Sequence, residues 1–277
     1  MNLNKLIEQY IEIGYKRDDA VSKVAQDIIL FKISKSSFSK VITIKGGVVM
    51  HSISKDNRRA TRDIDLDFIK YSLEDDSIND FIEKLNLLND GISIEIEGKI
   101  EKLHHQDYDG KRVNIKLKDF QNYIINTKLD IGVHKLFDLE QDKYCFDLGI
   151  IGESVSLLIN SKEQIFVEKL KSLLKFGITS TRYKDIFDFY YLINSEKLDK
   201  DKLLNYIDIL IFKDLIMKEN SFESIVTRME IIFKNRRYKS MLSEANNNWL
   251  NLSVEVVINN ILEFLSSLEL VGVQYEQ

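Results

Sequence analysis

The sequence has no proline, only one cysteine, no excess of basic residues and no long apolar run. Cys145 alone can form neither an intrachain disulfide nor a thiolate zinc site, which is typical of a reducing compartment. The net charge of -5, from 44 acidic and 39 basic residues, argues against a general nucleic-acid coat protein, whose binding would rest on excess Lys and Arg. A local basic groove remains compatible with this charge. The absence of proline carries no mechanistic implication.

The start of the chain and its apolar content bear on localisation. Residues 1–5 lack the apolar stretch of a signal peptide, and no apolar run reaches the roughly 18 residues that a transmembrane helix needs. We therefore expect a cytoplasmic protein with no membrane partner. With 277 residues, 44% hydrophobic and 30% charged, the chain can fill one large globular domain or two ordinary ones.

Hydrophobic periodicity differs between the two halves of the chain. In the first half, β-branched and alternating runs predict strands, and apolar residues at helical spacing predict helices. The predicted strands are residues 41–44, 64–69, 92–96, 113–117 and 129–133. The predicted helices of this half are residues 17–35, 48–54 and 73–88. The second half contains only predicted helices, at residues 162–176, 183–193, 202–217, 222–233 and 254–268.

This change of period predicts an α+β half followed by an all-helical half. We place the boundary near residue 160, which gives domains 1–160 and 161–277. No linker composition marks the boundary.

Three aspartates, Asp63, Asp65 and Asp67, alternate with apolar residues along the second predicted strand. Residues two apart on a strand point to the same face, so the three carboxylates line one side. They repel one another unless water or a cation lies between them, and hard divalent cations such as Mg²⁺ take oxygen ligands and share substrate phosphates. Taken alone, the pattern is also typical of an edge strand with a solvated acidic face.

Gly46 and Gly47 lie between the first predicted strand and the helix that follows. Taken alone, a glycine pair often marks only a tight turn. Glycines also let the backbone approach a triphosphate, and a following helix offers free N–H groups and a favourable dipole. The chain has no GxxxxGK[ST] segment, which excludes a P-loop. The glycines and the aspartates together predict a metal-dependent phosphate site.

Two segments of the chain resemble a known signature. The first segment resembles GG…R-x-[ST]-x-D-x-D, with Gly46, Gly47, Arg59, Thr61, Asp63 and Asp65. The second segment is similar to E-K…R-x-K-D-x-x-D, with Glu168, Lys169, Arg182, Lys184, Asp185 and Asp188. On these segments the chain resembles the AbiEii/AbiGii toxin family of the nucleotidyltransferase superfamily, over roughly residues 40 to 195.

The resemblance implies both a fold and an activity. The fold would be a nucleotidyltransferase-like mixed sheet with flanking helices, followed by a helical domain that contributes nucleotide- and acceptor-binding residues. The activity would be transfer of a nucleoside monophosphate from an NTP to an acceptor, with two Mg²⁺ or Mn²⁺ ions and release of pyrophosphate. The resemblance further implies an RNA acceptor, particularly a tRNA 3′ end, and a toxin of an abortive infection system in phage defence. A separately encoded antitoxin would be its partner.

The resemblance also implies roles for individual residues. In the superfamily a later strand supplies a third carboxylate, and Asp130 fits best because apolar residues flank it; Asp138 and Asp147 are weaker alternatives. The expected catalytic and metal-binding residues are Asp63, Asp65 and Asp130. The expected nucleotide-binding residues are Gly46, Gly47, Arg59, Thr61, Lys169, Arg182, Lys184 and Asp185.

One departure from the family pattern and several alternatives stand beside this interpretation. The family usually has Thr-Ala-Leu after the glycines, where this chain has Val48, Val49 and Met50, so a hydroxyl that would help to hold a phosphate is missing. The spacing of Lys184 and Asp188 also suits a plain surface ion pair. A basic cluster, which we define as Lys234, Arg236, Arg237 and Lys239, is either a solvated helix end or a contact to a phosphate backbone.

Two other functions remain open at this point. The chain could nucleotidylate a small molecule such as an antibiotic, and its net acidic charge favours a cationic acceptor of that kind. It could also be a regulator that binds NTP without turnover, although the intact acids argue against this.

Overall fold

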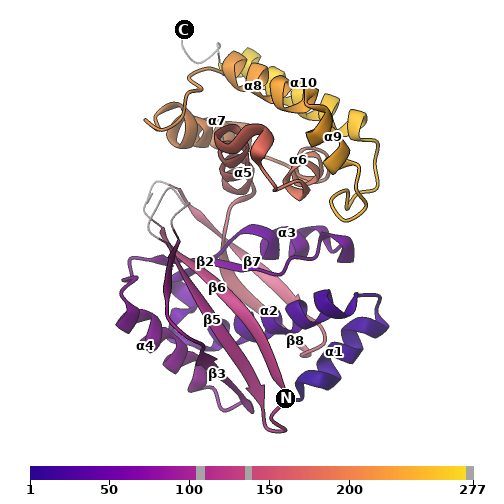
Figure 1. The fold of residues 1–277 in the computed structure, drawn as a ribbon. Coiled ribbons are helices and arrows are strands. Elements are labelled where there is room, and N and C mark those ends of the chain that lie inside the picture. The colour runs from indigo at the N-terminus through magenta and orange to yellow at the C-terminus, as the bar shows by residue number, and fades with distance from the viewer. Residues whose placement is uncertain (104–109, 135–138, 273–277) are drawn as a thin grey trace. The chain divides into compact units, whose positions relative to one another are not determined.

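The computed structural model of the chain describes residues 1–103, 110–134 and 139–272, and it divides into two compact units between Asn160 and Ser161 (Figure 1). The first unit contains a mixed sheet with helices, and the second is helical. The predicted fold class, a mixed sheet with flanking helices followed by a helical region, is confirmed. None of the described helices is long and apolar enough to cross a membrane.

The first unit is built on one eight-stranded sheet with the order β3-β5-β6-β2-β1-β8-β7, and β4 pairs with β5 beside this path. The strands are β1 (Ile42–Ile44), β2 (Ile64–Ile69), β3 (Ile92–Ile96), β4 (Glu101–Leu103), β5 (Gly110–Asp119), β6 (Ile124–His134), β7 (Gln141–Leu148) and β8 (Glu153–Asn160). β2 runs parallel to β6 and β1 runs parallel to β8, whereas the other pairs are antiparallel. β2 and β6 therefore lie side by side at the centre of the sheet, although three other strands separate them in the sequence.

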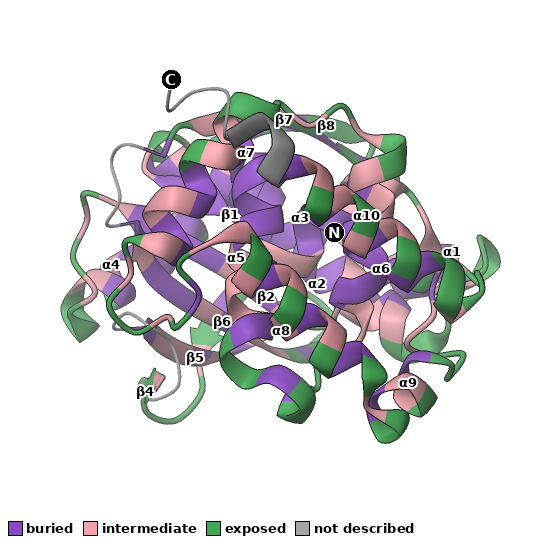
Figure 2. Ribbon diagram, turned by 90° about the horizontal axis from the view of Figure 1, so that it is seen from above, coloured by how far each residue is buried: buried purple, intermediate pink, exposed green. Residues whose placement is uncertain are grey.

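The helical segments of this unit are α1 (Leu3–Glu12), α2 (Arg17–Lys35), η1 (Ser37–Lys40), α3 (Gly46–Ser54), η2 (Asn57–Arg59) and α4 (Asp75–Asn86). α2 is buried continuously from Val24 to Ile33 and contacts β6 and β8, so it forms the centre of the core (Figure 2). α1 packs against α2.

The sheet has one apolar and one polar face. On β5, Val113, Ile115 and Leu117 are fully buried, and the residues between them are polar and only partly buried. On β2, Phe68 packs against Phe81 of α4, with ring centroids 5.4 Å apart. The apolar side chains therefore face the helices, and the alternate side chains form the polar face, as is common where a sheet is covered on one side.

The second unit consists of α5 (Lys162–Phe176), η3 (Gly177–Thr179), α6 (Lys184–Ser195), α7 (Lys200–Ile207), η4 (Asp208–Phe212), α8 (Phe222–Lys234), α9 (Arg236–Leu242) and α10 (Val254–Gly272). The prediction of one helix over residues 202–217 is wrong. α7 widens into the π-helical turn η4, and the Asp214 side chain then accepts a hydrogen bond of 2.8 Å from the Ile216 backbone N–H. Such a local side-chain bond competes with the helix, which ends there.

Candidate active site

Two aspartates lie side by side on the central strands of the polar face. The parallel pairing of β2 with β6 places Asp65 directly opposite Asp130. Both residues are half-buried, and the Asp130 side chain is only 10% exposed. Asp63 stands just before β2 with a side chain that is 47% exposed. Two carboxylates at facing positions on neighbouring strands repel each other, so this arrangement favours cationic partners.

The two glycines pack against the other motif residues. A Cβ atom at Gly46 would lie 2.4 Å from Asp65 Oδ2, and one at Gly47 would lie 2.5 Å from Thr61 Oγ1. Gly46 also has φ +62°, a conformation that side chains disfavour. The backbone N–H of Lys45 donates to the Asp65 carbonyl at 3.0 Å, which holds the two segments together. The glycines are therefore required by the close approach of Asp65 and Thr61.

The helix after β1 begins at Gly46, two residues before the predicted start at residue 48. Its N-cap residue, Lys45, makes no side-chain capping bond. The first turn of α3 thus consists of Gly46, Gly47 and Val48, beside the Asp65 carboxylate. A helix N-terminus of this kind presents backbone N–H groups and the positive end of the helix dipole.

Each of three aspartates on or beside β2 and β6 has a basic partner. Lys128 Nζ lies 3.0 Å from Asp63 Oδ1, and Lys45 Nζ lies 2.8 Å from Asp67 Oδ2. Arg112 on β5 donates two hydrogen bonds to Asp130, and this pairing raises the pKa of the Arg112 guanidinium. Within the three described ranges, no group of three or more His, Cys, Asp or Glu side chains is arranged to hold a metal ion.

Two further predicted residues of the first unit, Arg59 and Thr61, lie in the segment between α3 and β2. Arg59, on η2, is 4% exposed. The Thr61 carbonyl accepts a hydrogen bond of 2.7 Å from Gln26 Nε2 on α2, which anchors the segment leading to Asp63. Asp147 lies on β7, three strands from β2 at the edge of the sheet, and Asp138 lies outside the described residues.

The second motif forms a buried ion-pair network within the helical unit. Lys169 of α5 pairs with both Asp185 and Asp188 of α6, and Lys169 Nζ lies 3.0 Å from Asp188 Oδ2. Trp249 Nε1 donates to Asp188 Oδ1 at 3.1 Å. The Asp188 side chain is fully buried, so its contact with Lys169 belongs to the interior of the helical unit and not to its surface. Within this unit the motif joins α5, α6 and the segment before α10.

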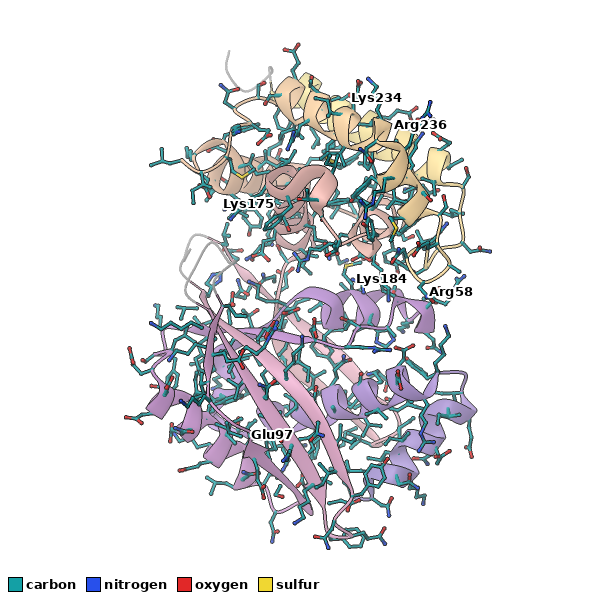
Figure 3. The ribbon with its side chains drawn as sticks, viewed as in Figure 1. Arg58, Glu97, Lys175, Lys184, Lys234 and Arg236 are labelled. Carbon is teal, nitrogen blue, oxygen red and sulfur yellow. The ribbon has the colours of Figure 1, made fainter. Side chains whose placement is uncertain are left out.

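Arg182 and the basic cluster are more exposed than this network. The Arg182 guanidinium is 59% exposed and lies 3.8 Å from Asp185 Oδ2. In the basic cluster, Lys234 pairs with Glu230 and Lys239 pairs with Glu255, at 2.7 Å and 2.5 Å. Lys234 ends α8 and Arg236 begins α9, as Figure 3 shows.

Sequence reasoning missed the two basic partners Arg112 and Lys128. Lys128 could have been found, because it lies one residue before the predicted strand 129–133, and extending that strand by one residue places Lys128 on the same face as Asp130. Arg112 gave no such signal, because the predicted strand began at residue 113 and only the register of β5 against β6 brings it opposite Asp130.

No curated protein sequence matches the chain. A family model described as "Nucleotidyl transferase AbiEii toxin, Type IV TA system" matches residues 28–246. This range includes both motifs and the aspartates of β2 and β6 described above. The chain therefore belongs to the AbiEii family of nucleotidyl transferase toxins of type IV toxin–antitoxin systems, a membership that implies an antitoxin partner.

Proposed function

We propose that the chain transfers a nucleoside monophosphate from an NTP to an acceptor hydroxyl, releases pyrophosphate, and does so with divalent cations at Asp63, Asp65 and Asp130. The observation that supports this most is the placement of Asp65 between Asp130 and Gly46. One carboxylate thereby adjoins both a second carboxylate and the N-terminus of a helix, which are the two kinds of group that metal-bound phosphates require.

The chemistry of the donor atoms suits two Mg²⁺ or Mn²⁺ ions, although the three side chains, as they lie in the structure, are not gathered around one ion position. Asp63, Asp65 and Asp130 offer only oxygen atoms, which these hard cations prefer. Glycine at position 46 lets the N-terminus of α3 approach Asp65 Oδ2 more closely than a side chain would allow. Two bound ions would activate the attacking oxygen and stabilise the leaving pyrophosphate.

The triphosphate would lie against the first turn of α3. Gly46 and Gly47 let the backbone approach it, and the N–H groups of this turn would donate to its oxygens. Val48 carries no hydroxyl, so the backbone supplies these contacts. We assign Arg59 and Thr61 to the same nucleotide site, since Thr61 Oγ1 lies beside Gly47.

In the second unit we propose nucleotide-binding roles for Lys169, Arg182, Lys184 and Asp185, which rest on the motif. Arg182 has a largely exposed guanidinium, and its contact with Asp185 Oδ2 is long, at 3.8 Å, so it can turn towards a phosphate at small cost. Lys169 is engaged by two carboxylates, so a phosphate contact would require Asp185 or Asp188 to release it.

The acceptor that we propose is RNA, with the tRNA 3′ end as the first candidate, in a cytoplasmic toxin of phage defence by abortive infection. This part rests on family resemblance, which is a weaker basis for a substrate than for a reaction. A cationic small molecule, such as an antibiotic, is the second candidate, because the chain has a net charge of -5.

The test is incubation of the protein with each labelled NTP, Mg²⁺ and total RNA, followed by electrophoresis. Label should move onto RNA with the wild type and not with Asp65→Asn. Asp76→Asn, at an exposed position on α4, is the matched control and should keep full transfer. Tight NTP binding without transfer to RNA or to a small amine would support a non-catalytic regulator instead.

A further inference from the structure

Arg112 on β5 faces Asp130 on β6, which itself faces Asp65 on β2. Its Cα is paired with that of Asp130, which in turn is paired with Asp65. Arg112 Nε donates to Asp130 Oδ1 at 2.8 Å and Nη2 donates to Oδ2 at 2.7 Å. One guanidinium therefore engages both oxygens of the carboxylate that the proposed function assigns to a metal ion.

This pair is of the strong kind. Two parallel charge-assisted hydrogen bonds between a guanidinium and a carboxylate are stronger and more specific than a single contact. The Asp130 side chain is 10% exposed and that of Arg112 is 33% exposed, so water competes only weakly for Asp130. A carboxylate with so little water around it needs a cationic partner at all times.

The partner of Asp63 is held less firmly. Lys128 makes a contact of 3.0 Å, and the two side chains are 34% and 47% exposed. Exposed pairs of this kind contribute about 0–1 kcal/mol and exchange readily with solvent or ligands. Asp63 and Asp130 thus differ in how easily a divalent cation can reach their carboxylates.

We propose that Arg112 is a positioning residue that competes with a divalent cation for Asp130. The guanidinium holds the Asp130 carboxylate beside Asp65 and must release it before Asp130 can ligate an ion. Ion binding then begins at Asp63 and Asp65, and Asp130 joins only at the expense of the Arg112 pair. This inference rests on the proposed function of the site.

The test measures Mn²⁺ binding to the full chain by titration calorimetry, without any NTP. Arg112→Gln leaves the Asp130 carboxylate without its cation and should tighten Mn²⁺ binding at least about tenfold, since charge-assisted hydrogen bonds of this strength no longer compete. Arg112→Lys, which keeps the charge but not the two parallel bonds, should give a smaller gain. It also serves as the test if circular dichroism shows that Arg112→Gln does not fold.

A matched control lies on the same strand and the same face. Lys116 pairs with Glu97 at 2.7 Å, and Figure 3 labels Glu97. Lys116→Gln should leave Mn²⁺ affinity unchanged, because its partner Glu97 is not one of the three proposed metal ligands. The gain in Arg112→Gln should also vanish in the double variant Arg112→Gln/Asp130→Asn.

The possible results separate this inference from the proposed function. Mn²⁺ binding that depends on Asp65 but does not change in either Arg112 variant overturns the inference alone. A gain that persists in the double variant also overturns it, because the effect then bypasses Asp130. A wild-type chain that binds no Mn²⁺, with or without ATP, overturns the proposed function and this inference together.

Discussion

The two units use the same ion-pair chemistry in opposite ways. On the polar face of the sheet, Lys128 and Asp63 form a contact with both side chains at least a third exposed. In the helical unit, Lys169 and Asp188 are 8% and 0% exposed. The first pair can exchange its partners for solvent or ligand. The second cannot do so without leaving a charge in the protein interior.

This difference separates charges that are available for chemistry from charges that hold a fold together. An exposed pair contributes little stability, so a cation or a phosphate can replace one partner at small cost. Removing one partner of a buried pair costs several kcal/mol because the other charge stays behind. We therefore propose that the reactive groups lie on the sheet and that the buried network stabilises the helical unit.

The largest expected effect is on activity. Asp65→Ala, and likewise Asp63→Ala, should lower transfer at least about 1,000-fold, since each removes a ligand of the divalent cations that would stabilise the transition state. The fold should persist, and thermal stability without metal should stay equal or rise slightly, because repulsion between carboxylates is relieved. Turnover with labelled NTP and thermal melting measure the two effects. A folded Asp65→Ala protein with near wild-type turnover would contradict the proposed role of Asp65.

The next effect tests whether the buried and the exposed ion pairs differ in their contribution to stability. Lys169→Ala should destabilise the chain by about 3–5 kcal/mol, because two buried carboxylates lose their cation. Lys128→Ala, the same substitution at the exposed pair, should cost no more than about 1 kcal/mol. Denaturant unfolding of both variants gives the two free energies. Equal small losses would place Lys169 outside the structural network.

A smaller effect tests why position 46 is glycine. Alanine in a left-handed conformation costs about 1–2 kcal/mol, so Gly46→Ala and Gly98→Ala, at φ +62° and +76°, should lose similar stability from strain alone. A Cβ at Gly98 meets nothing within 4 Å, whereas one at Gly46 displaces the Asp65 carboxylate. Only Gly46→Ala should therefore also lower transfer, by about 100-fold. Equal turnover in the two variants would refute the role of the close approach.

The smallest effect concerns the buried side of α3. Tyr15 Oη is 2.9 Å from His51 Nε2 of α3, and burial, with a contribution from Asp27, raises the pKa of Tyr15 to about 12. Between pH 10 and about 12 the unfolded chain loses a tyrosine proton that the folded chain keeps, so stability falls as pH rises through this window. Tyr15→Phe should show a shallower decline. Unfolding free energies on either side of pH 10 measure this, and parallel curves would contradict it.

The fold class could be predicted from the sequence because period-2 and period-3.6 patterns separate the two halves of the chain. Three strands, β4, β7 and β8, were not predicted. In β7 only Phe146 and Leu148 are buried, so the strand lies at an edge and most of its residues are polar or exposed. A strand of this kind carries little hydrophobic signal, and only pairing with β8 reveals it.

The motif acids could also be named from the sequence, but the arginine that pairs with Asp130 could not. The alternation of side chains along a strand is enough to predict that Asp63, Asp65 and Asp67 share one face. The pairing of Asp130 with Arg112 depends on the register of two antiparallel strands, which local sequence does not specify. The close packing of Gly46 on Asp65 likewise depends on tertiary contacts.

We propose that nucleotidyl transfer depends on the acids of the polar face at β2 and β6. The most direct test of this proposal compares Asp130→Asn with Asp147→Asn, an exposed acid on β7 of the same sheet, in transfer of label from NTP to RNA. Asp130→Asn should lose transfer while Asp147→Asn keeps it, with both proteins folded. Full transfer by Asp130→Asn, or an equal loss in both variants, would contradict it.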